Sequence, residues 1–68
     1  MKGTVKSYNT AKGYGFIIPH EGGKDIFVHI TAVQKAGLAY LFKGQRLAFE
    51  TIPDKQGRGL QAIELQAI

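Results

Sequence analysis

Apolar and polar residues alternate along five short stretches of this chain, and this period-two pattern constrains the fold more than any other feature. The alternating stretches, separated by turn-forming residues, are residues 3–9, 14–18, 25–30, 45–52 and 60–68. Strict alternation is typical of a β-strand with one buried face, whereas an amphipathic helix repeats every 3.6 residues. Five such strands with short connections predict an all-β fold, a five-stranded antiparallel meander or barrel.

The connections between these strands contain residues suited to reversing the chain. Residues 9–13, 19–25 and 53–59 carry Gly, Asn, Asp or Pro where tight turns need them. The longer connection, residues 31–44, is expected to open with a helical turn capped by Thr31. On the inner side of the strands the alternation predicts a core of Val5, Ile17, Ile26, Val28, Val33, Leu41, Leu47, Phe49, Ile63 and Leu65.

Length and composition exclude several classes of protein. Sixty-eight residues make one domain, residues 1–68, with a thin core. The absence of cysteine excludes a disulfide-stapled miniprotein and a Cys-based zinc module, and it is compatible with a cytoplasmic setting. No apolar run approaches the ~18 residues of a membrane span. Nine Lys and Arg against five Asp and Glu give a net charge of +4, which favours polyanionic partners, nucleic acid first.

Aromatic side chains gather on the side of the strands opposite the predicted core. Tyr14 and Phe16 project together from one strand, and Phe27 and His29 repeat that spacing on the next. If these strands pair antiparallel, the four rings form one patch, with Tyr8 at its edge. Such rings can be cross-strand pairs that only stabilise the sheet. A cluster of four exposed rings more often marks an interaction surface, and nucleobases stack on such rings.

Positive charges accompany these rings. Lys6, Lys12, Lys24 and Arg58 lie near the ends of the ring-bearing strands or in the loops, where they can meet phosphates. Rings for bases and cations for the backbone are the two elements of a surface that binds single-stranded nucleic acid. The pattern therefore favours single-stranded RNA or DNA as the partner.

Two motifs give the chain a family resemblance that covers nearly its whole length. "KGYGFI" (residues 12–17) resembles the first ribonucleoprotein motif of the cold-shock domain, and "DIFVHI" (25–30) resembles the second. The resemblance implies a five-stranded OB-type barrel that binds single-stranded, pyrimidine-rich RNA or DNA, with RNA-chaperone or antitermination activity in the cytoplasm. By the same resemblance, the binding positions are Lys6, Tyr8, Lys12, Tyr14, Phe16, Phe27, His29 and Arg58.

Three positions depart from the family pattern. Ser7, Ile30 and Leu38 stand where the family usually carries aromatic residues. Each lost ring removes a stacking platform, at about 1 to 3 kcal/mol each. Tyr40 and Phe42 are possible replacement rings. We therefore expect binding that is weakened or redirected rather than lost.

A second hypothesis concerns the segment 37–43. This segment is unusually apolar for a barrel loop, and its Leu38, Tyr40 and Phe42 exceed what so small a core can bury. The alternative function is a weakly binding or non-binding barrel that self-associates through this loop, so the chain is either a monomer or a homodimer. The other interpretation is that the loop folds over the barrel end as additional core.

Catalytic, metal and cofactor sites find little support in the sequence. His20, Glu21, Asp25 and His29 match no metal-binding spacing, and the alternation separates the two histidines. "GRGLQA" (57–62) fits the letters of a dinucleotide fingerprint but lacks the βαβ unit that the fingerprint requires. We expect no enzyme activity, metal or cofactor.

Overall fold

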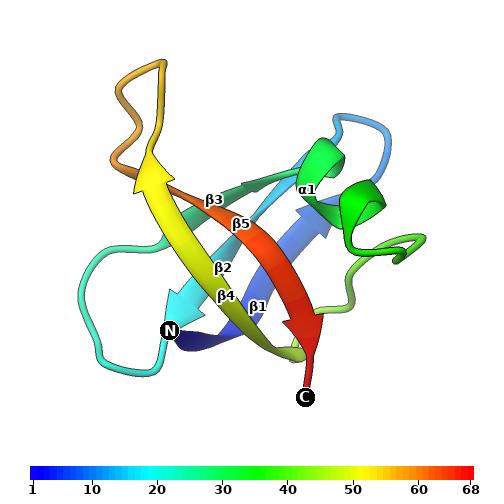
Figure 1. Cartoon of the computed structure of the whole chain (residues 1–68), viewed down its shortest axis with the longest axis horizontal. Coiled ribbons are helices and arrows are strands. Elements are labelled where there is room, and N and C mark those ends of the chain that lie inside the picture. The colour runs from blue at the N-terminus through cyan, green and yellow to red at the C-terminus, as the bar shows by residue number, and fades with distance from the viewer.

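The computed structural model describes all 68 residues and shows a closed five-stranded barrel (Figure 1). This confirms the expected all-β, OB-type architecture. Around the barrel the strands follow the order β1-β2-β3-β5-β4, and β4 closes the ring against β1. One helix separates β3 from β4. The elements are β1 (Lys2–Asn9), β2 (Tyr14–Pro19), β3 (Ile26–His29), α1 (Ile30–Lys35), β4 (Arg46–Pro53) and β5 (Leu60–Ala67).

The expectation of a purely antiparallel barrel is wrong for one pair of strands. β3 and β5 run parallel, with Phe27 opposite Gln61 and Val28 opposite Ala62. The cause is the number of strands. Directions can alternate all the way round a closed ring only if the number of strands is even, so a ring of five contains at least one parallel pair. Here the long crossover that a parallel pair requires runs through α1, the connection after it, β4 and the β4–β5 loop.

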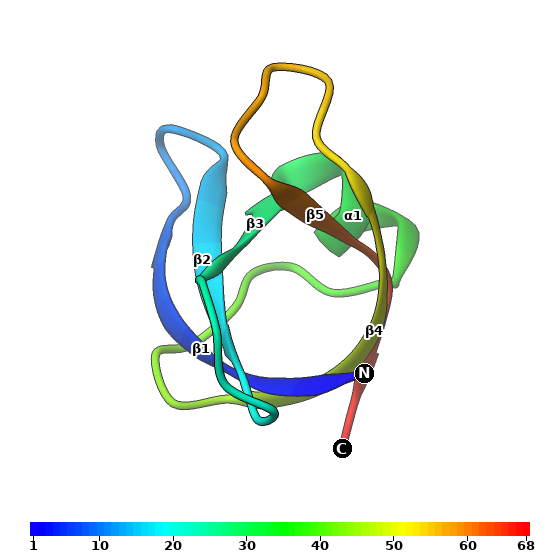
Figure 2. The same ribbon diagram turned by 90° about the vertical axis from the view of Figure 1, so that its left-hand side faces the viewer.

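A β-bulge bends β1 so that it can serve two neighbours. Val5 lies opposite Ile17, but Ser7 lies opposite Phe16, so Lys6 is an extra residue in the ladder. A bulge of this kind bends the strand and increases its twist. Residues 2–4 of β1 pair with β4, and residues 3–9 pair with β2, so Gly3 and Thr4 have a neighbour on each side. The curvature of β1 round the barrel is visible in Figure 2.

The interior of the barrel follows the predicted core closely. Every predicted core residue except Ile63 is buried, and Ala32, from α1, and Ala62 join them. Ile63 is half-buried because Ala62 takes the inward position opposite Val28. Glu64 has a left-handed backbone (φ 53°), and the next inward side chain is Leu65. The regular alternation of β5 is therefore broken at one residue.

The helix begins two residues earlier than expected, and a different residue caps it. α1 starts at Ile30, and His29 rather than Thr31 is its N-cap. The Nδ1 atom of His29 accepts a hydrogen bond from the backbone N–H of Thr31 at 3.2 Å. This satisfies one of the N–H groups that the first turn of a helix leaves unpaired. No helix in the structure is long and apolar enough to span a bilayer.

Candidate nucleic-acid interface

Four rings on β2 and β3 form one cluster on the outer face of the barrel. The antiparallel register places Tyr14 opposite His29 and Phe16 opposite Phe27, so the strands pair as the expected patch of rings requires. Ring centroids of Tyr14 and Phe27 lie 5.7 Å apart with planes inclined by 30°, and those of Phe16 and Phe27 lie 5.9 Å apart, edge to face. His29 lies 6.2 Å from Phe27. We call these four residues the aromatic cluster.

Gly15 explains why a residue without a side chain separates two rings. It lies on the inner side of β2, opposite Tyr8 of β1. A Cβ atom at this position would collide with the carbonyl oxygen of Ser7 and would lie only 2.8 Å from the Tyr8 Cα. Glycine therefore lets β1 pass close to β2 while Tyr14 and Phe16 both remain on the outer face.

Phe27 is covered rather than exposed, which the sequence did not predict. Only 2% of it is accessible, yet it does not belong to the core cluster. Its neighbours are the other rings of the aromatic cluster and Arg58, whose guanidinium carbon lies 3.8 Å from the ring centroid. The ring therefore belongs to the outer face, and a cation–π contact covers it from outside.

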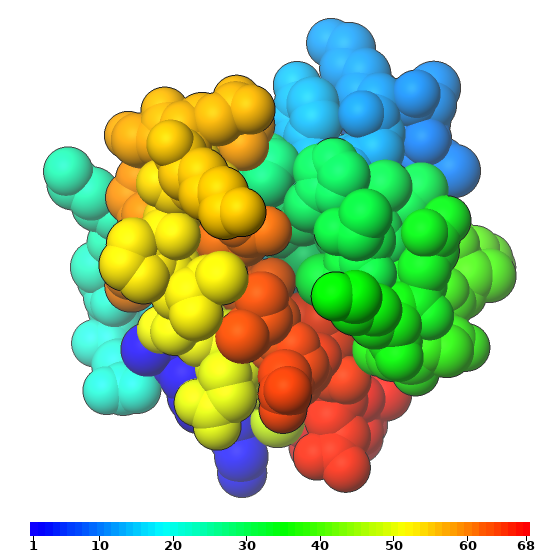
Figure 3. All heavy atoms as spheres, turned by 45° about the horizontal axis from the view of Figure 1, so that its top comes forward, coloured from blue at the N-terminus to red at the C-terminus, as the bar shows by residue number.

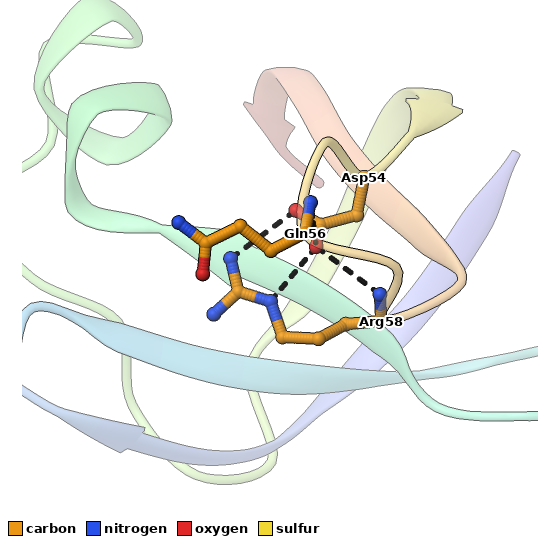
Figure 4. A network of polar contacts seen from close by, with 3 residues as sticks. All are labelled: Asp54, Gln56 and Arg58. Atoms are coloured by element: carbon orange, nitrogen blue, oxygen red, sulfur yellow. Dashed lines mark hydrogen bonds and ion pairs between the residues drawn. The ribbon is translucent and has the colours of Figure 1, made fainter.

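Asp54 holds Arg58 in this position. Its carboxylate accepts hydrogen bonds from the Arg58 side chain, from Nε at 2.8 Å and from Nη2 at 3.2 Å (Figure 4). It also accepts from the backbone N–H groups of Arg58 and Gln56. The hydrogen bonds from Arg58 hold the pKa of Asp54 below its ordinary value, so the carboxylate is charged at neutral pH. We call this arrangement the Asp54–Arg58 clasp.

The role of His29 as a helix cap fixes its ring. Because Nδ1 accepts the hydrogen bond from the Thr31 N–H, the neutral ring carries its proton on Nε2. The Thr31 hydroxyl lies 3.0 Å from the same Nδ1. The helix start thus positions one member of the aromatic cluster and leaves Nε2 as a hydrogen-bond donor.

Apart from Arg58, the predicted cations have no cation–π contact with the rings, and their surroundings differ. Lys6 pairs with Asp25 at 2.9 Å, and both side chains are accessible, so the pair is a weak surface ion pair. Lys12 and Lys24 are exposed, Lys24 beside Arg58 along a small groove. The β1–β2 loop, which carries Lys12, and the β4–β5 loop, which carries Arg58, project from the same end of the barrel (Figure 2).

Several other candidate residues lie away from the aromatic cluster. Tyr8 packs against the core, and its buried hydroxyl has no hydrogen-bond partner. Burial raises the pKa of that hydroxyl. Leu38 also packs against the core, and Ile30 is half-buried at the start of α1. The edge-to-face pair Tyr40 and Phe42 is exposed and also lies apart from the cluster. Ser7 differs from these residues, because it is exposed and lies opposite Phe16, a member of the aromatic cluster.

Strand pairing extends the outer face beyond the residues that the sequence suggested. Phe27 lies opposite Gln61 of β5, and Gln61 lies opposite Ile52 of β4, which is exposed. A groove of about 970 Å³ runs from Phe27 and His29 between α1, β5 and the β4–β5 loop (Figure 3). Sequence reasoning missed Gln61 and Ile52 because alternation gives the face of a residue but not the neighbour of its strand.

The histidines and Asp25 of residues 20–29 each contact a different residue and do not come together in one site. His20 lies with its Nε2 atom 3.0 Å from the Thr4 hydroxyl, and Asp25 pairs with Lys6. No three His, Asp or Glu side chains come close enough together to hold a metal ion. Asp54 was also missed by sequence reasoning; its signal was the four-residue spacing to Arg58 within a glycine-rich turn.

A closed five-stranded barrel with clustered rings and flanking cations on its outer face is the design of small OB-type proteins that bind nucleic acid. Comparison with known proteins gives the particular family. The model of the 'Cold-shock' DNA-binding domain matches residues 1–68, and the chain belongs to this family of non-enzymatic nucleic-acid-binding proteins.

Curated relatives support the same assignment over nearly the full chain. A probable cold shock protein, y4cH, of Sinorhizobium fredii is 48% identical over 65 residues, which cover 96% of this chain and 94% of the relative. The cold shock-like protein CspC of Shigella flexneri is 48% identical and covers 100% of this chain and 96% of its own. The cold shock-like protein CspE of Escherichia coli K12 is 47% identical over 84% of this chain and 83% of the relative.

Proposed function

We propose that this protein binds single-stranded, pyrimidine-rich RNA or DNA, with bases stacked on the aromatic cluster and phosphates held by Lys6, Lys12 and Arg58. One observation carries the proposal: four rings from two strands lie within 6.2 Å of a neighbour on one outer face. Each base that stacks on such a ring contributes about 1 to 3 kcal/mol. In a duplex the base faces are already stacked on one another, so this surface selects unpaired strands.

The biological role that fits such contacts is RNA chaperoning or antitermination in the cytoplasm. Stacking depends little on base identity, so the protein can hold many different unpaired segments. Because Ser7 offers no ring and Ile30 and Leu38 are aliphatic and partly buried, few platforms are present and each complex is short-lived. A strand that is held briefly and then released is kept from forming stable misfolded structure without any input of ATP.

A titration at low salt tests this proposal. We expect oligothymidine and oligouridine to bind at micromolar protein while a duplex of equal length binds far more weakly. Because lysine and arginine displace counterions from the strand, log K should fall with log salt by about 0.7 for each phosphate neutralised. Fluorescence anisotropy of a labelled oligonucleotide measures both quantities. Absence of binding at high micromolar protein would overturn the proposal.

The same titration with Ser7→Trp tests where the bases lie. Ser7 is exposed and lies opposite Phe16, so a tryptophan there adds a ring beside the aromatic cluster. We expect affinity for oligothymidine to rise about 5- to 140-fold, the equivalent of one stacked base. Gln34→Trp, an equally uncharged change at an exposed position of α1, is the matched control and should change affinity little. Equal gains from both variants would contradict the placement.

A further inference from the structure

Arg58 occupies the place on Phe27 that a stacked base needs. The guanidinium carbon lies 3.8 Å from the ring centroid, which is a stacking distance, and Arg58 together with the neighbouring rings leaves only 2% of Phe27 exposed. A base cannot reach the face of this ring while Arg58 remains there. Other members of the aromatic cluster are half-buried and still present accessible surface.

The loop that carries Arg58 is held in one conformation by hydrogen bonds between its own residues. The carboxylate side chain of Asp54 is only 3% accessible, although the Arg58 side chain is 41% accessible. Backbone bonds add to the clasp: the Asp54 N–H donates to the Gly59 carbonyl at 2.8 Å, and the Gly57 N–H donates to the Asp54 carbonyl at 3.1 Å. A two-point bond from a guanidinium to a shielded carboxylate is among the stronger polar contacts in proteins.

We infer that Arg58 is a built-in competitor for the base site on Phe27, and that Asp54 is the positioning residue that keeps it there. This inference rests on the proposed function. Binding then involves an exchange. Arg58 leaves Phe27 and Asp54, a base takes its place on the ring, and the released guanidinium pairs with a phosphate of the incoming strand.

The exchange explains how one residue can both oppose and assist binding. The free protein has a cation–π interaction and an ion pair at this point, and the complex has a base stack and an ion pair to phosphate instead. The two states are therefore close in free energy. Arginine suits this role because its planar group stacks on rings and pairs with either carboxylate or phosphate. A strand therefore binds only if its stacking and phosphate contacts outweigh the contacts of Arg58 with Phe27 and Asp54. This competition keeps binding reversible.

Weakening the clasp should strengthen binding. Asp54→Asn keeps an oxygen for the backbone N–H groups of the loop but removes the charge that holds the guanidinium. Glu64→Gln is the matched control: Glu64 lines the same groove, makes no hydrogen bond to Arg58 and carries the same charge. We expect Asp54→Asn to bind oligothymidine about tenfold more tightly than Glu64→Gln, the scale of one charged hydrogen bond. No difference between the two would overturn the inference.

Two further measurements make the test specific to Phe27. In a Phe27→Ala background, Asp54→Asn should no longer bind oligothymidine more tightly than Glu64→Gln, because the ring that Arg58 covers is absent. A difference in affinity that persists there contradicts the inference. Arg58→Lys conserves charge but lacks the planar fork, so it should bind at least as tightly as wild type, and weaker binding also contradicts the inference.

The clasp itself can be observed without nucleic acid. Proton NMR should show Arg58 side-chain signals shifted upfield by the Phe27 ring in the wild type, and this shift should be lost in Asp54→Asn. If the shift is absent from the wild type, the clasp does not exist in solution and the inference fails. If the shift is present but neither the wild type nor any variant binds oligothymidine, the proposed function is what fails.

Discussion

Replacing Phe16 and Phe27 together with alanine is expected to weaken binding of oligothymidine by about 30-fold or more while the barrel stays folded. Each ring supports about 1 to 3 kcal/mol of base stacking, so losing both removes at least about 2 kcal/mol. Phe16 is half-buried on the outer face, and Phe27 is covered from outside by Arg58. Neither belongs to the contact cluster inside the barrel, but Phe27 is only 2% accessible, so its truncation also lowers the free energy of unfolding.

A third phenylalanine provides the control for this double variant. Phe42 is 57% exposed and pairs with Tyr40, outside the aromatic cluster. Phe42→Ala removes one ring of the same kind and should reduce affinity far less than the double variant does. Anisotropy titrations give the affinities, and circular dichroism spectra confirm that each variant is folded. A folded double variant with wild-type affinity would show that these rings do not carry the binding.

Gly15→Ala is expected to lower the free energy of unfolding by about 3 kcal/mol or more, a large share of the roughly 3 to 10 kcal/mol available to a chain of this length. The added methyl group meets backbone atoms of Ser7 and Tyr8, which cannot move aside as a flexible side chain can. Strand β1 has to separate from β2, and the platform under Tyr14 and Phe16 is lost with it. Urea denaturation followed by circular dichroism measures the change.

Gly22 supplies the matched comparison for this glycine substitution. It has a left-handed backbone (φ 87°), but an added Cβ would meet nothing within 4 Å. Gly22→Ala therefore incurs only the strain of that backbone conformation, about 1 to 2 kcal/mol. Equal destabilisation by the two substitutions would mean that close strand contact at Gly15 is not what the fold requires.

Much of the fold and part of the candidate site follow from alternation in the sequence. Because side chains on a strand point to alternate faces, the positions of Phe16 and Phe27 on the outer face and of Val28 and Leu47 in the core could be predicted without any structure. The antiparallel pairing of the two ring-bearing strands was the condition on which the single patch of rings depended, and the structure meets it. Alternation is a local property that each strand carries by itself.

The remaining features depend on contacts between distant parts of the chain. The parallel pairing of β3 with β5 arises only when five strands close into a ring, and it alone brings Gln61 beside Phe27. Similarly, alternation places Phe27 outward but cannot show that Arg58, thirty-one residues later, covers it. Ile63 was misplaced because the left-handed residue Glu64 breaks the regular pattern of its strand.

Mapping the contact surface by NMR is the most direct test of the claim that unpaired bases stack on the aromatic cluster. On addition of oligothymidine, the largest changes in ring and amide signals should fall on Tyr14, Phe16, Phe27 and His29, with Arg58 losing its ring-current shift. Changes confined to the segment 37–43, around Tyr40 and Phe42, would contradict the claim. Concentration-dependent changes in that segment without nucleic acid would instead favour self-association through it.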